Sequence, residues 1–116
     1  MKIKYQIEQD LSAMAFKELL IKSSLGNRRP IEDFARITSM IKNANLIITA
    51  RDKNQLVGVA RSITDQVYCT YLSDLAVDSA YQKQGIGKEL IKITKLATPQ
   101  AKLILLSAPK AVTYYP

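Results

Sequence analysis

The stretch Leu72–Ile91, with the sequence LSDLAVDSAYQKQGIGKELI, decides the fold of this chain. The apolar run Tyr71–Val77 is typical of a strand, and Gly85–Ala97 has the apolar repeat of a helix. Two of the four glycines, Gly85 and Gly87, lie where that helix begins. Because a helix start leaves backbone N–H groups unpaired at the positive end of the helix dipole, the stretch predicts an anion-binding turn between strand and helix.

Two well-known phosphate-binding motifs do not fit this turn. A Walker A loop needs Ser or Thr after Gly-Lys, and here Glu89 follows Gly87-Lys88. The dinucleotide fingerprint needs a third glycine where this chain has Leu90. It also needs an acidic residue at a strand end about 20 residues further on, and none is found there.

The pattern that does fit is Q-x-x-G-x-G, from Gln82 to Gly87, directly after a strand and its short connector. It resembles the acetyl-CoA loop of the GNAT N-acetyltransferase superfamily. The resemblance implies that Leu75 and Val77 hold the pantetheine arm with main-chain groups, that Gln82 shapes the loop, and that amides from Lys83 to Lys88 hold the pyrophosphate. The residues it assigns to the coenzyme are Leu75, Ala76, Val77, Gln82, Lys83, Gln84, Gly85, Ile86, Gly87 and Lys88. The alternative is a glycine-containing loop without a ligand.

Length and composition set the class of protein. A chain of 116 residues is long enough for one core, so we expect a single domain, 1–116. The charged, alternating first residues are not typical of a signal peptide, and no apolar run approaches the ~18 residues of a membrane span. The single cysteine, Cys69, excludes an internal disulfide, and the lack of histidine removes the commonest zinc ligand and general base. We expect a cytoplasmic protein without a metal or a membrane partner.

The net charge of +7 has two explanations. Lysines and arginines bind nucleic-acid phosphates, and they also suit a small polyanion such as coenzyme A. The basic residues are scattered, in runs of at most two, and no zinc-finger or RNA-recognition signature is present. We therefore expect no nucleic-acid partner.

Hydrophobic periodicity predicts the order β-α-α-β-β-β-α-β-α. The expected strands are 2–7, 46–51, 55–63, 67–77 and 101–107, and the three central ones form an antiparallel meander. Asp10 or Ser12 is expected to cap the first helix, and Pro30 to begin the second, with Ile31, Phe34, Ile37 and Ile41 on its buried face. Gly58 indicates a bulge or a close backbone approach.

This order matches the GNAT fold, an α+β (mixed α/β) class with a mostly antiparallel sheet and one splayed parallel strand pair. GNAT chains usually continue into a C-terminal hairpin that completes the sheet, and we expect this hairpin to be missing from the present sequence, which ends at Pro116. The last parallel strand would then have an unprotected edge. The expectation is either a truncated chain or a second subunit that supplies the missing wall, and hence a possible homodimer.

The resemblance implies direct acetyl transfer from a thioester to an amine. A strand N–H near Leu75 or Ala76 would stabilise the carbonyl oxygen. Ala111-Val112-Thr113-Tyr114-Tyr115 fits the family pattern A-x-x-[FY]-Y, which makes Tyr115 the candidate general acid, with a packed tyrosine as the alternative. The contact that the family often makes with Asn at position 108 is in doubt, because this chain has Ala108.

The sequence identifies no general base. Asp74 alternates away from Leu75, so a structural role is open to it. Arg28-Arg29 lies in the loop where the family builds a wall of the acceptor pocket. We expect a solvated loop, and the alternative is contact with an acidic acceptor or the coenzyme.

The acceptor is expected to be a small-molecule or peptide amine. The alternative function is a coenzyme A-binding GNAT-like module without turnover. A basic nucleic-acid-binding domain is the more distant alternative.

Overall fold

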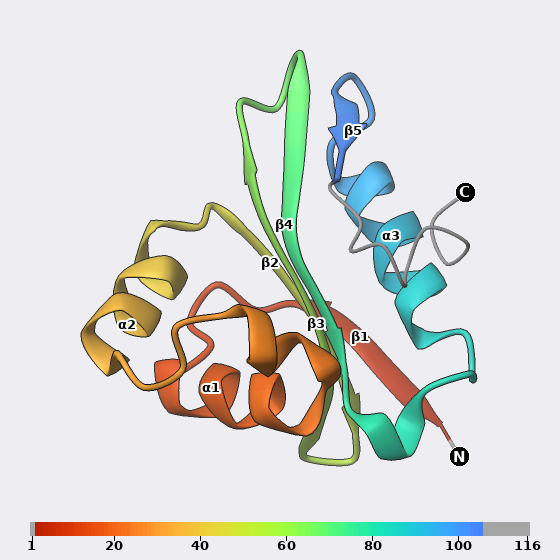
Figure 1. Ribbon diagram of the computed structural model, residues 1–116. Coiled ribbons are helices and arrows are strands. Elements are labelled where there is room, and N and C mark those ends of the chain that lie inside the picture. Colours follow the sequence, from red (N-terminus) through yellow and green to blue (C-terminus); the bar gives the residue numbers. More distant parts are fainter. Residues whose placement is uncertain (1, 106–116) are drawn as a thin grey trace.

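Five strands form one sheet, in which they lie side by side in chain order, β1-β2-β3-β4-β5. The computed structural model describes residues 2–105 (Figure 1). The strands are β1 (Ile3–Ile7), β2 (Leu46–Asp52), β3 (Gln55–Thr64), β4 (Cys69–Val77) and β5 (Lys102–Ile104). Neighbours from β1 to β4 pair antiparallel, and β4 pairs with β5 in parallel. The predicted α+β class, meander and parallel pair are confirmed.

Helices cover both faces of this sheet (Figure 1). On one face lie α1 (Ala13–Lys22) and α2 (Phe34–Asn43), and on the other lies α3 (Ile86–Ala97). Two short 3-10 helices, η1 (Ser24–Arg28) and η2 (Ser79–Tyr81), follow α1 and β4. Because side chains alternate along a strand, Ile47 joins the core under α1 and α2, while its neighbour Ile48 joins the core under α3.

The helix starts confirm one expectation and correct another. Ser12 caps α1, because its Oγ accepts a hydrogen bond of 3.1 Å from the Ala15 N–H. The second helix was expected to begin at Pro30, and that was wrong. The Asp33 N–H donates to the Pro30 carbonyl (3.0 Å), which closes a turn, and Asp33 then caps α2 from Phe34 onward. Phe34, expected on the buried face, is 42% exposed.

The strand ends also differ from the expectation. The Asp65 carboxylate accepts hydrogen bonds from the N–H groups of Val67, Tyr68 and Cys69, so these residues form a tight loop and β4 begins only at Cys69. The expected strand 101–107 is shorter at both ends within the described residues, because β5 covers Lys102–Ile104 and leaves out Ala101 and Leu105. Its last two positions lie outside the described residues, as does the helix expected from Pro109.

Gly58 meets both expectations placed on it. The register between β2 and β3 shifts after the pair Ala50–Gly58, so a bulge lies next to the glycine. A Cβ on Gly58 would lie 3.1 Å from both Ile86 Cγ2 and Leu90 Cδ1. The missing side chain therefore lets the first turns of α3 approach the sheet closely.

A chain of buried threonine hydroxyls fixes the other end of α3. Thr70 Oγ1 on β4 lies 2.7 Å from Thr64 Oγ1 and 2.8 Å from Thr98 Oγ1, and Thr98 Oγ1 donates to the Thr94 carbonyl (3.1 Å). All four threonines are buried. Since a buried hydroxyl needs a hydrogen-bond partner, these linked threonine hydroxyls set the position of α3 against β3 and β4.

Glu8 and Arg51 join the end of β1 to β2. Arg51 donates to both carboxylate oxygens of Glu8, from Nη2 (2.7 Å) and Nε (3.1 Å), and Thr49 Oγ1 donates to the same carboxylate (2.8 Å). The Arg51 guanidinium holds the pKa of the Glu8 carboxyl at about 2, well below its usual 4.5. The side chains are only 16% and 23% exposed, so solvent screens the pair less than an ordinary surface ion pair.

We expect Glu8→Gln to remove part of the acid sensitivity of the fold. A carboxyl whose pKa is lower in the folded chain stabilises it at pH values above the unfolded pKa, and this contribution is lost as the pH falls through the folded pKa. Glu8 should therefore contribute about 2 kcal/mol near neutral pH, after allowance for screening, and lose it between about pH 5 and pH 2.

The measurement is the free energy of unfolding in urea from pH 7 to pH 2. Glu8→Gln should flatten the curve, while Glu32→Gln, at an exposed position in a loop, should follow the unchanged chain. Parallel curves for Glu8→Gln and the unchanged chain would contradict the role of the ion pair.

Candidate functional site

The parallel strand pair separates along most of β4. Residues Cys69–Tyr71 pair with Lys102–Ile104, and no residue from Leu72 to Val77 pairs with another described strand on this side. A bulge at Ser73 lies where the strands part, because Arg61 pairs with Asp74 and Ser62 with Leu72. The second half of β4 therefore presents an open edge to a ligand, within the described part of the chain.

The register decides which main-chain groups face that edge. The Asp78 N–H donates to the Val57 carbonyl (2.8 Å), and bonded and non-bonded pairs alternate in an antiparallel ladder. The main-chain groups of Ala76 therefore point to β3, and those of Leu75 and Val77 point to the open edge. The Val77 carbonyl there accepts a hydrogen bond from Gln82 Nε2 (3.1 Å), so this side chain folds the loop back onto the strand.

Side chains also fix the connector between β4 and α3. Ser79 Oγ donates to the Lys22 carbonyl at the end of α1 (2.7 Å). Tyr81 Oη donates to Asp52 Oδ2 in the hairpin between β2 and β3 (2.8 Å), and this bond raises the pKa of Tyr81. Asp78 caps η2 through its bond from the Ala80 N–H (2.9 Å). The turn is thus held in place from both sides before any ligand binds.

The start of α3 forms a cradle of backbone N–H groups. Gly85 is its N-cap, with φ of +83° and no side chain to cap the helix. The N–H groups of Ile86, Gly87 and Lys88 have no backbone or side-chain acceptor within residues 2–105. A Cβ added to Gly85 would meet no atom of the described residues within 4 Å, so these residues leave the space above the turn open. This arrangement is suited to an anion.

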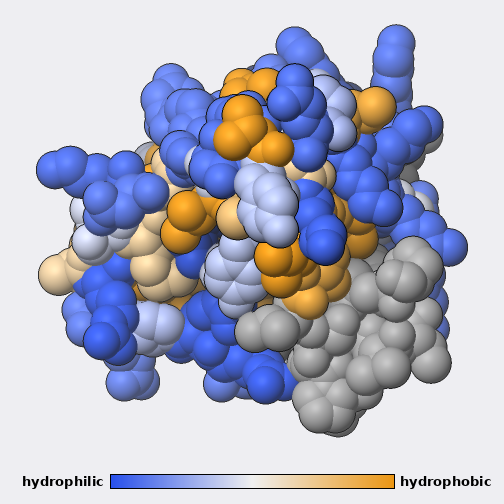
Figure 2. All heavy atoms as spheres, turned by 90° about the horizontal axis from the view of Figure 1, so that it is seen from above, coloured by the Kyte–Doolittle hydropathy of each residue, from blue (hydrophilic) through white to orange (hydrophobic). Residues whose placement is uncertain are grey.

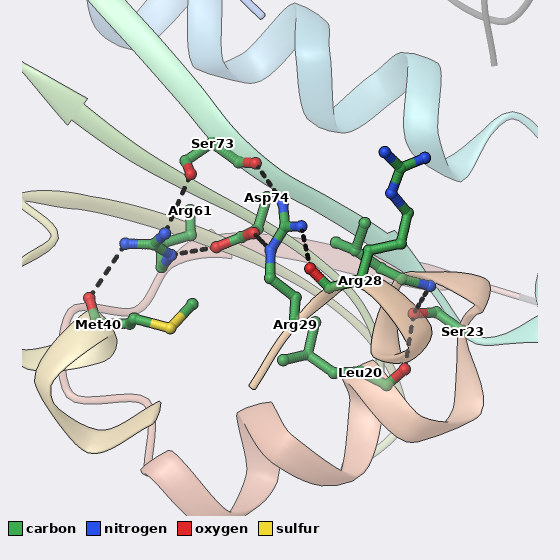
Figure 3. Close-up of polar contacts among 9 residues, drawn as sticks. Leu20, Ser23, Arg28, Arg29, Met40, Arg61, Ser73 and Asp74 are labelled. Atoms are coloured by element: carbon green, nitrogen blue, oxygen red, sulfur yellow. Dashed lines mark hydrogen bonds and ion pairs between the residues drawn. The ribbon is translucent and has the colours of Figure 1, made fainter. Parts of the chain in front are cut away.

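Two arginines share one buried carboxylate on the opposite face of β4 (Figure 3). Asp74, which is fully buried, accepts a hydrogen bond from Arg29 Nε on one oxygen and from Arg61 Nε on the other. Arg29 Nη2 also donates to the Ser73 carbonyl (2.9 Å), and Arg61 Nη2 donates to Ser73 Oγ (3.1 Å). The guanidiniums therefore hold the bulged residue as well as the carboxylate.

Ser23 directs the chain so that Arg29 reaches this position. Its Oγ donates to the Leu20 carbonyl (3.0 Å) and accepts from the Leu25 N–H (3.1 Å), which ends α1 and begins η1 (Figure 3). Arg29 directly follows η1, and Arg61 comes from the middle of β3. Arg61 Nη1 additionally donates to the Met40 carbonyl in α2 (3.2 Å). Asp74 on β4 is thus bonded to the residue that follows η1 and to β3, and through Arg61 it is linked to α2.

A protein-family model described as an acetyltransferase (GNAT) domain matches residues 22–116. This chain belongs to the GNAT acetyltransferase family. The histone acetyltransferase TAP1 of Glycine max is 26% identical over 102 aligned residues, which cover 76% of this chain and 43% of that protein. The probable acetyltransferase TAP2 of the same organism is also 26% identical and is covered to 40%. The chain thus spans about two fifths of the length of these curated relatives.

Solved GNAT structures have the same fold. A GNAT family acetyltransferase from Streptococcus pneumoniae aligns over 98% of this chain and 83% of its own, with a TM-score of 0.82 and 22% identity. A probable acetyltransferase from Staphylococcus aureus gives the same TM-score and identity over 98% and 86%. An aminoglycoside acetyltransferase from a soil metagenome, crystallised with sisomicin, gives a TM-score of 0.66 and 25% identity over 97% and 81%.

The GNAT site residues expected from the sequence fall into three groups. Leu75, Val77, Gln82 and the turn Lys83–Lys88 lie together at the open edge and the start of α3. Ala76 lies on the same strand with its main chain toward β3, so Leu75 is the better placed N–H donor. Tyr115, with its motif from Ala111, lies outside the described residues. The assigned roles in binding and catalysis stay predictions.

Sequence reasoning missed the part that Arg61 plays, and it misjudged Arg29. The pair Arg28-Arg29 was expected in a solvated loop, and this holds for Arg28, which is exposed, but Arg29 pairs with Asp74. A signal was available, because Arg61 and Asp74 are opposite charges in two neighbouring apolar strands. The strand register that brings the two charges together could not be read from the sequence, because it depends on the bulge at Ser73.

Two other kinds of site are absent from the described residues. No group of three or more His, Cys, Asp or Glu side chains within residues 2–105 is placed to hold a metal ion. No helix in that range is both long and apolar enough to cross a membrane. The cytoplasmic location, the lack of a nucleic-acid partner and the possible homodimer stay predictions.

The end of the sheet away from the cradle carries exposed apolar side chains. Ile63, Tyr71 and Ile104 are in register across β3, β4 and β5, and Ile63 and Ile104 are 48% and 42% exposed. Figure 2 looks onto this end and shows apolar atoms in separate groups among polar ones. This dispersed arrangement identifies no single contact surface.

We expect Asp74→Asn to destabilise the fold by about 3 kcal/mol, because it leaves two guanidiniums without their shared countercharge. Urea unfolding at pH 7 measures this, and Asp33→Asn is the control, since Asn also caps a helix and should change little. A loss below 1 kcal/mol would show that the carboxylate is dispensable for stability.

Proposed function

We propose that this GNAT domain binds acetyl-CoA and transfers its acetyl group directly to an amine. The observation that carries the proposal is the placement of the open edge of β4 beside the unpaired N–H groups of α3. The open edge of β4 offers hydrogen bonds to an extended amide-containing arm, and the N–H groups of α3 offer hydrogen bonds to phosphate oxygens. A two-part ligand with an extended arm and a pyrophosphate fits this pair of features.

In this proposal, the main-chain groups of Leu75 and Val77 bind the arm, and the N–H groups of Ile86, Gly87 and Lys88 bind the phosphates. Lys83 and Lys88 add positive charge, and both are exposed. The Ile86 side chain is buried against the sheet, so its contribution is the N–H alone. Gly85 leaves space above the turn for a phosphate to approach.

Acetyl-CoA supplies an activated acyl carbon in its thioester. The acceptor amine, in its neutral form, forms a C–N bond to the carbonyl carbon, the C–S bond breaks, the nitrogen loses a proton and the sulfur gains one. Negative charge develops on the carbonyl oxygen, and in this proposal the Leu75 N–H, which points to the open edge, donates a hydrogen bond to it. This donor is part of the folded strand, so it needs no rearrangement during the reaction.

Asp74 is the carboxylate of β4, and we assign it no role as a base. Both of its oxygens accept hydrogen bonds from guanidiniums, and it has no exposed surface. We propose that the amine proton leaves through water, and that Tyr115 protonates the departing sulfur. The lack of a free carboxylate on β4 also favours a second candidate, a coenzyme A-binding domain without turnover.

Calorimetric titration with acetyl-CoA tests the cradle. We expect saturable binding by the unchanged chain and at least about tenfold weaker binding by Gly85→Ala, because the new Cβ enters the space proposed for a phosphate and the residue is strained at positive φ. Gly87 is buried, so Gly85 is the better position to change. Thermal unfolding of Gly85→Ala, run alongside, separates a loss of fold from a loss of binding.

Lys88→Gln, with Lys95→Gln as its control, measures how much the positive charge of Lys88 contributes to acetyl-CoA binding. Both lysines are exposed on α3, about 10 Å apart along its axis. Lys88→Gln should weaken binding several-fold, and Lys95→Gln should leave it unchanged. Equal effects would contradict a localised cradle. An assay of free thiol release with a broad panel of amines then separates the acetyltransferase from the coenzyme A-binding domain without turnover. Binding of acetyl-CoA without acetyl transfer to any amine would favour the binding domain.

A further inference from the structure

The face of β4 opposite α3 carries an excess of positive charge beside the open edge. Asp74 provides one negative charge for the two guanidiniums of Arg29 and Arg61. Arg28, next in sequence to Arg29, is exposed and forms no ion pair within residues 2–105. Its guanidinium points away from the buried carboxylate (Figure 3). The cluster as a whole has three positive charges and one negative charge.

Arg29 retains donors that the fold does not use. A guanidinium has five N–H donors in a fixed fork. In Arg29, Nε donates to Asp74, Nη1 to the Arg28 carbonyl (2.9 Å) and Nη2 to the Ser73 carbonyl (2.9 Å). Two N–H groups remain, and the side chain is 22% exposed. Arg29 is therefore fixed in position and still able to donate to a ligand at the surface.

This cluster lies close to the place where the acceptor must arrive. Arg29 binds the carbonyl of Ser73, which is two residues from Leu75, the proposed donor to the thioester oxygen. The cradle at α3 lies on the other face of the sheet. If acetyl-CoA is held on the face of α3, the acceptor amine approaches the strand edge from the face of α1 and η1. Arg28 and Arg29 come from the end of η1 on that side (Figure 3).

We propose that the acceptor is an amine that also carries a carboxylate, and that Arg28 and Arg29 bind this carboxylate. The inference rests on the proposed acetyl transfer and names the acceptor class for the same site. Guanidinium and carboxylate form charge-assisted, often bidentate, hydrogen bonds. Within residues 2–105, Asp74 is the carboxylate that forms ion pairs on this face of β4, and its two arginines neutralise it, so the face repels polycationic amines and attracts anionic groups.

Matched acceptors test the charge requirement. The full chain is assayed with acetyl-CoA for acceptor-dependent release of free coenzyme A thiol. The acceptors are amino acids, their amides, their methyl esters and spermidine. Each acceptor presents an amine for the same exchange, in which a C–N bond forms, the C–S bond breaks and a proton passes from nitrogen to sulfur. We expect kcat/KM for a free acid to exceed that of its amide by about tenfold or more.

Arg28→Gln should remove most of this preference. It should raise KM for the free acid about tenfold, with KM for acetyl-CoA and for the amide unchanged. Arg36→Gln, which removes the same charge from an exposed position on α2, is the control and should change none of these values. Arg29 is a poorer test position, because its substitution also breaks the bond to Asp74.

Three results would overturn the proposal. One is a preference for amides or spermidine over free acids. Another is a rise in KM for acetyl-CoA in Arg28→Gln, which would assign the arginine to the coenzyme. If no acceptor is acetylated, the coenzyme A-saturated chain is titrated calorimetrically with the free acids. Lack of binding of the free acids is then the third result that overturns the proposal. Lack of acetyl-CoA binding, measured separately, defeats the proposed function itself, and the acceptor inference falls with it.

Discussion

The shape of the site depends on one buried carboxylate and the bulge beside it. Burying Asp74 is costly unless its charge is met, and Arg29 and Arg61 meet it from two directions. The bulge at Ser73 makes this possible. Leu72 faces α3, and strict alternation would point Asp74 the same way, into an apolar core. The extra residue turns Asp74 to the other face and returns Leu75 and Val77 to the face of α3.

The bulge also marks where the parallel strands part. β5 pairs with β4 as far as Tyr71, and the ladder ends before Ser73. The guanidiniums hold the Ser73 carbonyl and hydroxyl, so the bulge is fixed by contacts with η1 and β3. An open strand edge, normally a liability, is therefore available at a defined place beside the start of α3. Ion pair, bulge and open edge form a single structural unit.

Opposite faces of this unit have different chemical characters. On the side of α3, a short turn with unpaired N–H groups is held by bonds to α1 and to the hairpin between β2 and β3. On the other side, Arg29 and Arg61 contact the strand through Ser73 and Asp74. An acetyl donor and an acceptor amine that approach the same strand edge from these two faces need not compete for the same protein groups. This separation agrees with the proposed direct transfer, in which both substrates would be bound together.

The sequence by itself determined the class of fold, the order of the elements and the glycine-containing turn before α3, because these depend on local signals. Apolar repeats, the cap at Ser12 and the glycines before α3 act within a few residues. Tertiary structure decided what Asp74, Arg29 and Arg61 do, since the contacts span 45 and 13 residues along the chain. The start of α2 is also set locally, but it was predicted wrongly, because the turn at Pro30 closes through the Asp33 N–H and Asp33 then caps the helix. Charges far apart in the sequence meet only once the register is set, and one bulged residue sets it here.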